Sequence, residues 1–183
     1  MIWNMIHFSE LEPLGASKQL LAYSEAYLES AGHLCGILAA TPAESNYPRS
    51  AVVLSLTFHG IELFLKAAIL EKAPNEQFSD HNLDHLGKRY EKLYPAKKHT
   101  FDILFRDEEI VLDDPDPLVI KEFERQIAEL KRATPTDQLH RYPQDIKGDS
   151  WKGLYSFEAS SFAGDISKVQ QRVARLKELI FNS

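Results

Sequence analysis

The chain has 183 residues, of which 44% are hydrophobic and 26% are charged, with a formal net charge of −6 and a single cysteine. This composition is typical of one globular domain and excludes an intrinsically disordered chain. One cysteine excludes an internal disulfide framework and a zinc site built from several thiolates, and the negative charge argues against broad electrostatic coating of nucleic acid.

Two long helices are predicted in the N-terminal half. The first covers about Ser17 to Ala40, because apolar residues recur there at spacings of three, four and seven. Its predicted buried stripe is Leu20, Tyr27, Ala31, Leu34 and Leu38. The second covers about Pro48 to Lys72 and is apolar on nearly every side, so we expect it to be the central helix, covered by its neighbours.

A short third helix is predicted next, capped by Ser79 or Asp80 and closed by Tyr94-Pro95. Its expected inner face consists of Leu83, Leu86, Tyr90 and Leu93. The pattern over residues 97–112 is ambiguous, because a short helix there competes with a solvated acidic cluster.

Two more helices complete the prediction. A fourth begins near Pro115 or Pro117, residues 136–155 look irregular, and a last helix runs from about Ser161 to Phe181. Because the chain contains no internal repeat and no linker, residues 1–183 are expected to form a single domain. We expect an all-α, up-and-down bundle of four to five helices.

One polar strip interrupts the apolar second helix. At about 100° per residue, Ser55, Glu62 and Lys66 fall within roughly 60° of His59 on the same side of that helix. Glu62 and Lys66 are four residues apart, in the order that favours an ion pair. Since burying an unpaired charge costs several kcal/mol, the strip either faces solvent or lines a polar cleft that contains partners.

Two other segments supply candidate partners for such a cleft. The first is residues 81–85, which begin with His81 at the start of the third helix. The second is residues 139–145, where Arg141 precedes Tyr142-Pro143. A guanidinium donates two parallel hydrogen bonds to a carboxylate, so Arg141 is expected either to bind at the site with Glu62 or only to pin the loop to the bundle.

Three motifs in order resemble the HEPN superfamily of small α-helical bundles. Residues 58–67, Phe-His-Gly-Ile-Glu-Leu-Phe-Leu-Lys-Ala, resemble its long central helix. Residues 81–86, His-Asn-Leu-Asp-His-Leu, resemble the start of its next helix, although Asp80 stands where glycine is common. Residues 139–143, Leu-His-Arg-Tyr-Pro, resemble a loop before the final helix of some members.

Many HEPN proteins are ribonucleases whose signature is an arginine and a histidine with four to six residues between them, and this signature is missing here. No histidine has an arginine at that spacing; Arg132 and His140 come nearest, with seven residues between them and Thr134-Pro135 interrupting the helix. The resemblance therefore implies a noncatalytic or weakly catalytic binding module, associated with RNA or a nucleotide and linked to toxin–antitoxin or defence systems. The alternative is a metal-independent ribonuclease that uses His81 or His140 as proton shuttle.

The polar strip on the second helix predicts a site, and the resemblance implies partners. The expected ligand-binding residues are His59, Glu62, Lys66, His81 and Arg141, where the histidines contact a phosphate and Glu62 orients Arg141. No cofactor is expected. A homodimer and a cognate antitoxin or nucleotidyltransferase partner are the expected assemblies.

Other function classes have thinner support in the sequence. His59 and Glu62 have the i, i+3 spacing of one metal-ligand pair, but the second Glu-x-x-His of a di-iron bundle is missing. Cys35 lies on an apolar face and is expected to be a buried small residue. A basic run around the third helix offers an RNA-contacting surface or only a solvated face; it comprises Lys88, Arg89, Lys92, Lys97, Lys98 and His99.

The sequence pattern indicates neither a membrane-spanning segment nor a secretory signal. No uninterrupted apolar run approaches the roughly 18–20 residues that span a bilayer. Residues 1–5 lack a basic region followed by a long apolar stretch. We therefore expect a cytoplasmic protein without membrane contact.

Overall fold

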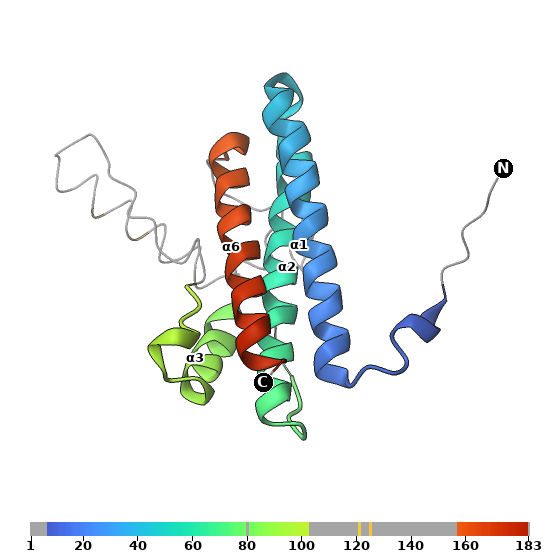
Figure 1. Ribbon diagram of the computed structural model, residues 1–183. Helices are drawn as coiled ribbons and strands as arrows, with labels where there is room; N and C mark the ends of the chain where they lie inside the picture. Colours follow the sequence, from blue (N-terminus) through green and yellow to red (C-terminus); the bar gives the residue numbers. More distant parts are fainter. Residues whose placement is uncertain (1–6, 80, 103–120, 122–124, 126–156, 183) are drawn as a thin grey trace.

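Four α-helices make up most of the part of the chain that the computed structural model describes, which is residues 7–79, 81–102, 121, 125 and 157–182 (Figure 1). They are α1 (Ala16–Ala40), α2 (Tyr47–Lys72), α3 (Leu83–Leu93) and α6 (Ala159–Ile180), and the short 3-10 helices are η1 (Phe8–Glu10), η2 (Pro42–Glu44) and η3 (Lys97–His99). These described residues contain no strand, so the all-α class predicted from the sequence is confirmed for them.

The predicted fourth helix and the irregular segment fall largely outside the described residues. Lys121 and Arg125, which lie within the predicted fourth helix, are helical. Arg141 and His140 both lie outside the described part of the chain.

Helix α1 runs antiparallel to both α2 and α6 (Figure 1). Ser24 Oγ donates a 2.7 Å hydrogen bond to the carbonyl of Gly60 in α2. Against α6, Lys177 contacts Glu25 near the start of α1, whereas Ala159 contacts Cys35 near its end. Helix α3 packs against the C-terminal half of α2, at the end of the bundle where α6 also ends (Figure 1).

The predicted buried stripe of α1 is wrong by one residue over much of its length. The buried apolar positions are Leu21, Leu28, Ala31, Cys35 and Leu38, whereas Leu20, Tyr27 and Leu34 are only half-buried. Both sets repeat every seven residues, so periodicity alone does not choose between them. The choice is made by the positions of α2 and α6, which cover adjacent sides of α1.

Side-chain caps set the start of three helices, two of them away from the predicted residue. Asn46 caps α2 by accepting from the backbone N–H of Arg49. Asn82, rather than Ser79 or Asp80, caps α3, because its side chain accepts from two backbone N–H groups in the first turn. Helix α6 begins at Ala159, two residues before the predicted start, because Glu158 caps it.

Helix α2 is the central helix, as predicted, and it contacts α1, α3 and α6. Ile61, Phe64, Leu65, Ala67, Ala68 and Ile69 are fully buried. By length and composition α2 is also the one described helix that is apolar enough to cross a membrane, although two thirds of its most apolar 18-residue window is buried inside the bundle. A core helix passes the same test, so the expected absence of a membrane segment stays a prediction.

Candidate functional site

A buried carboxylate on α2, that of Glu62, is surrounded by three nitrogen-bearing side chains. The residue is 1% exposed. Lys66 Nζ and His81 Nδ1 each lie 2.7 Å from Oε1 of Glu62, and His59 Nδ1 lies 3.5 Å from Oε2. We call these four residues the Glu62 cluster.

Helical geometry brings three members of the cluster together. His59, Glu62 and Lys66 are spaced i, i+3 and i+7, so successive turns of α2 place them on one side of the helix. His81 comes from the segment directly before α3, whose first turn is fixed by the Asn82 cap. A contact between residues 19 positions apart in the sequence therefore ties α3 to the middle of α2.

Two aromatic rings hold cluster members from the outside. Tyr27 of α1 packs edge-on against the ring of His59, with centroids 4.6 Å apart. Lys66 Nζ lies 5.4 Å from the centroid of the Phe78 ring, a cation–π distance. The two rings thus pack against the His59 imidazole and the Lys66 ammonium, which also contact Glu62.

Gly60 sets the distance between α1 and α2 beside the cluster. A Cβ atom at this position would lie 2.7 Å from Leu28 Cγ and 3.3 Å from the carbonyl oxygen of Ser24. Only a residue without a Cβ permits this approach. It lets the Ser24 hydroxyl reach the Gly60 carbonyl and holds α1 against α2 where Tyr27 meets His59.

The electrostatics of the cluster keep Glu62 ionised. Burial by itself would raise the pKa of this carboxyl, but hydrogen bonds from His59, Lys66 and His81, together with the charge of Lys66, lower the pKa well below its usual range. An ionised carboxylate only accepts hydrogen bonds. Nδ1 of His81 is therefore the protonated ring nitrogen in its 2.7 Å contact.

The cluster opens to solvent mainly through its histidines. The side chain of His81 is 53% exposed and that of His59 is 28% exposed, against 10% for Lys66. Glu62 holds the Nδ1 edge of the half-exposed His81 ring. The buried Glu62 carboxylate thus fixes the orientation of an imidazole that is half exposed to solvent.

Four of the five predicted site residues come together in the structure. His59, Glu62, Lys66 and His81 are in direct contact through Glu62, and Arg141 lies outside the described residues. The expectation that the strip is only the wet side of α2 is wrong for Glu62 and Lys66, which are 1% and 8% exposed. Ser55, one turn before His59, is half-buried and makes none of these contacts.

Sequence reasoning missed the residues that support the cluster. Tyr27 was assigned to the core stripe of α1, and Phe78 was not considered. Gly60 carried a usable signal, because a glycine in the middle of an apolar helix costs about 1 kcal/mol relative to alanine and so indicates a close approach. Nothing comparable in the sequence points to Phe78.

The other candidate chemistries find no built site in the described residues. No group of three or more histidine, cysteine, aspartate or glutamate side chains there is arranged to hold a metal ion. Cys35 is buried, as predicted, and its thiol donates to the carbonyl of Ala159. Within the predicted basic run, Arg89 pairs with Glu76, while Lys88, Lys92, Lys97 and Lys98 are exposed.

The chain matches no family model, no curated protein and no solved structure. The geometry of the Glu62 cluster is therefore the basis for proposing a function.

Proposed function

We propose that this chain is a HEPN-like, noncatalytic or weakly catalytic binding module that takes the phosphate of an RNA or nucleotide at the Glu62 cluster. The observation that carries the proposal is the 2.7 Å contact between Glu62 and His81, in which a 1% exposed carboxylate orients a half-exposed imidazole. Binding sites commonly fix an exposed polar group from a buried partner, which lowers the ordering cost of binding.

The charges of the cluster support an anionic ligand over a cationic one. Glu62 is one negative charge, and it is enclosed by Lys66 and by two histidines that gain positive charge on protonation. The carboxylate is buried, whereas the imidazoles reach the surface. When protonated, the ring of His81 would donate a hydrogen bond from Nε2 to an anionic ligand.

A binding assay tests the proposal. Fluorescence anisotropy with labelled single-stranded RNA, and calorimetry with nucleotides, measure Kd for the wild-type chain and for His81→Gln. We expect roughly a tenfold loss of affinity for this variant, since a hydrogen bond to a charged group contributes about 1.5–3 kcal/mol. His33→Gln, at an exposed position on the outside of α1, is the matched control and should leave Kd unchanged.

Unfolding in urea separates binding from folding in this test. His81→Gln removes a charge-assisted bond at the surface of the cluster and should remain folded. If it keeps wild-type affinity, or if no RNA or nucleotide binds to the wild-type chain, the binding proposal is wrong and the cluster serves only to dock α3 on α2.

A metal-independent ribonuclease is the second candidate, favoured by the same dyad. A carboxylate on Nδ1 orients the histidine and fixes its tautomer, which suits Nε2 for accepting a proton from a 2′-hydroxyl. Cleavage of single-stranded RNA in the presence of a chelator should then fall at least about 100-fold in His81→Ala, the usual contribution of a general acid–base residue. Equal product yields from wild type and variant exclude His81 as the proton shuttle.

The HEPN resemblance supplies the remaining proposals. We propose a cytoplasmic homodimer with an antitoxin or nucleotidyltransferase partner. Light scattering of the purified protein measures its molar mass in solution, which for a dimer should be twice the 20.9 kDa of one chain.

A further inference from the structure

A second group of polar side chains lies at the far end of α3, about 15 Å along the helix from His81. Among the buried side-chain nitrogen and oxygen atoms of the described residues, Nδ1 of His99 is the one without a hydrogen-bond partner. A buried polar atom left in this state costs about 1–3 kcal/mol. An unpartnered buried atom of this kind needs an explanation, and a functional role in ligand binding is one.

Three cations from three different elements gather around His99. Burial is the largest cause of the lowered pKa of this imidazole, and the positive charges of Lys98, Lys72 and Arg175 lower it further. Lys72 is the last residue of α2, and its Nζ lies 5.9 Å from the ring centroid of Tyr94, which packs edge-on against His99 at 5.3 Å. Arg175 of α6 donates to the carbonyls of Lys98 and Thr100, on either side of His99 in the sequence.

Among the described residues, no acid forms an ion pair with these cations. Within the described residues, Lys72, Lys98 and Arg175 have no carboxylate partner, and the acceptors of Arg175 are neutral carbonyls. Other described cations do have one: Arg89 pairs with Glu76, Arg172 with Asp102 and Lys177 with Glu25. Among the described residues, the charged groups that lower the pKa of the His99 imidazole are therefore all cations.

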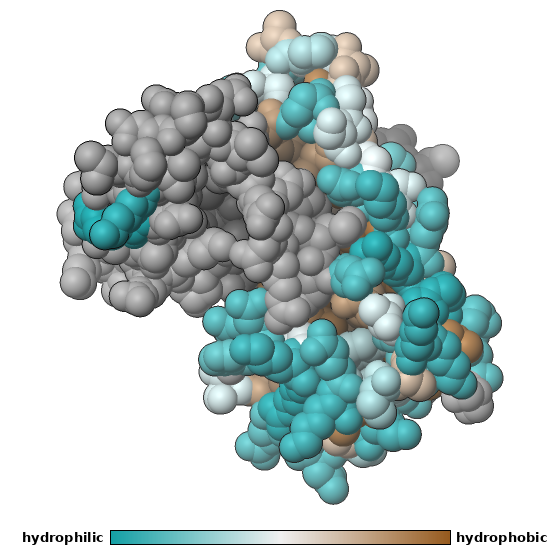
Figure 2. Space-filling model, turned by 90° about the vertical axis from the view of Figure 1, so that its left-hand side faces the viewer, coloured by the Kyte–Doolittle hydropathy of each residue, from teal (hydrophilic) through white to brown (hydrophobic). Residues whose placement is uncertain are grey.

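A hollow of about 520 Å³ adjoins this histidine. Its walls include Tyr94, Pro95, His99 and Phe101, and the carboxylates of Glu91 and Asp102 also line it. The charge of Asp102 is partly compensated by Arg172, 3.4 Å away. The volume falls in the range of pockets that bind small molecules. In the view of Figure 2, the described surface at the end of the molecule that carries α3 is largely hydrophilic.

We propose that His99, Lys72, Lys98 and Arg175 form an anion site that binds a small molecule bearing a phosphate group, with the ring or chain of that molecule in the adjoining aromatic hollow. In this arrangement binding exposes Nδ1 of His99, which is buried in the structure, and its N–H donates to a phosphate oxygen. Lys98 and Lys72 supply the charge, and Arg175 holds the backbone on either side of the histidine. This site is separate from the Glu62 cluster and does not depend on the function proposed for it.

Titrations with three probes test the site: inorganic phosphate, phenyl phosphate and benzylamine. Two-dimensional NMR of the full chain follows the imidazole signals of His99. We expect both phosphates to shift these signals, with phenyl phosphate binding more tightly, and benzylamine to leave them unchanged. Binding of benzylamine instead would show that Glu91 and Asp102 decide the charge of the occupant and would overturn the proposal. Failure of all three probes to bind would also overturn it.

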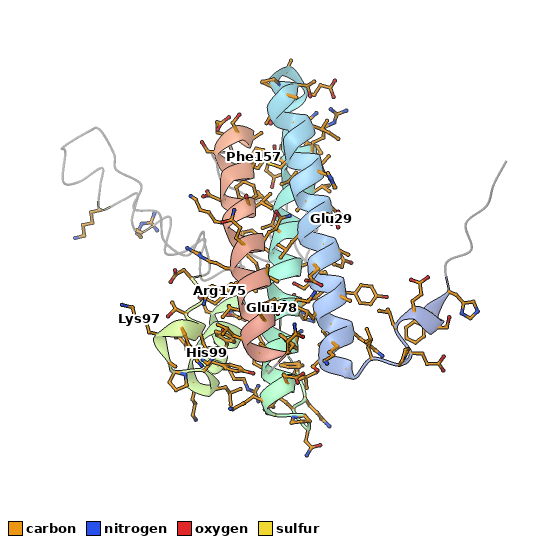
Figure 3. All side chains as sticks on the ribbon, viewed as in Figure 1. Glu29, Lys97, His99, Phe157, Arg175 and Glu178 are labelled. Carbon is orange, nitrogen blue, oxygen red and sulfur yellow. The ribbon has the colours of Figure 1, made fainter. Side chains whose placement is uncertain are left out.

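Charge-removing variants locate the binding in the structure. Lys98 is exposed, and Lys98→Gln should raise the Kd for phenyl phosphate about threefold to tenfold. Lys97→Gln is the matched control, because Lys97 extends outward from the bundle while His99 lies beside Arg175 (Figure 3). Equal losses in both variants would show only nonspecific attraction to a basic surface. His81→Gln should leave this affinity unchanged, so failure of either proposal is distinguishable from failure of the other.

Discussion

Replacing Glu62 with alanine should destabilise the fold far more than replacing any exposed glutamate. Glu62 is 1% exposed and Lys66 is 8% exposed, and their side chains are in direct contact at 2.7 Å. The substitution removes the counter-charge and leaves the Lys66 ammonium buried beside the Phe78 ring. Breaking a buried pair in this way costs about 3–5 kcal/mol, and the loss of the hydrogen bond to His81 falls within that range.

Urea unfolding followed by circular dichroism at neutral pH measures this free energy. Glu29→Ala is the matched control, because Glu29 is exposed on α1 (Figure 3) and a surface change of this kind usually stays within about 0.5 kcal/mol. The double variant Glu62→Leu/Lys66→Met removes both charges and keeps the volume. It should recover most of the lost stability, since well-packed apolar replacements of a buried ion pair are often neutral or stabilising.

Two results would refute the reasoning. A loss below about 1 kcal/mol in Glu62→Ala would mean that Lys66 reaches water in the native state. A double variant as unstable as Glu62→Ala would mean that the cost lies in lost packing or in the contacts to the histidines, and not in an uncompensated charge.

Three further outcomes follow from the same structure. The lowered pKa of Glu62 contributes stability that is present above the pKa of the unfolded carboxyl, about 4.3, and is lost as the pH falls from there toward the lower pKa of the folded state; the free energy of unfolding should therefore drop more steeply below about pH 4 in wild type than in Glu62→Gln, as acid unfolding curves will show. Gly60→Ala should cost about 1–3 kcal/mol through overlap with Leu28, whereas Gly36→Ala, with open space around it, should raise the melting temperature; calorimetry that finds equal effects contradicts the close approach. Cys35 is fully buried and burial raises its thiol pKa, so Ellman's reagent should label it only at the rate of unfolding; fast labelling of the native chain would show an open α1–α6 interface.

Much of the fold was predictable from local sequence rules. The bounds of α2 were predicted to within one residue at each end, because proline in the first turn and Ala73-Pro74 after the last one are local signals. The inner face of α6 follows the helical repeat of its apolar residues, and Phe162, Ile166 and Val169 are all buried. One broad apolar stripe packs against one side there, so periodicity has a single solution.

The phase of α1 was not predictable in the same way. Residues 20, 27 and 34 are spaced seven apart and form one row along the helix, and residues 21, 28 and 35 form the neighbouring row. A helix in contact with two neighbours buries the row that faces the seam between them. That seam exists only once α2 and α6 are in place.

The sequence by itself determined that Glu62, His59 and Lys66 share one side of an apolar helix, because the helical repeat fixes relative direction along a single element. It also determined that burying this strip would require partners. Only the tertiary structure decided that the strip is buried, that His81 arrives from 19 residues away, and that His99 meets Lys72 and Arg175. Those contacts join separate helices, and their geometry depends on packing that no local rule contains.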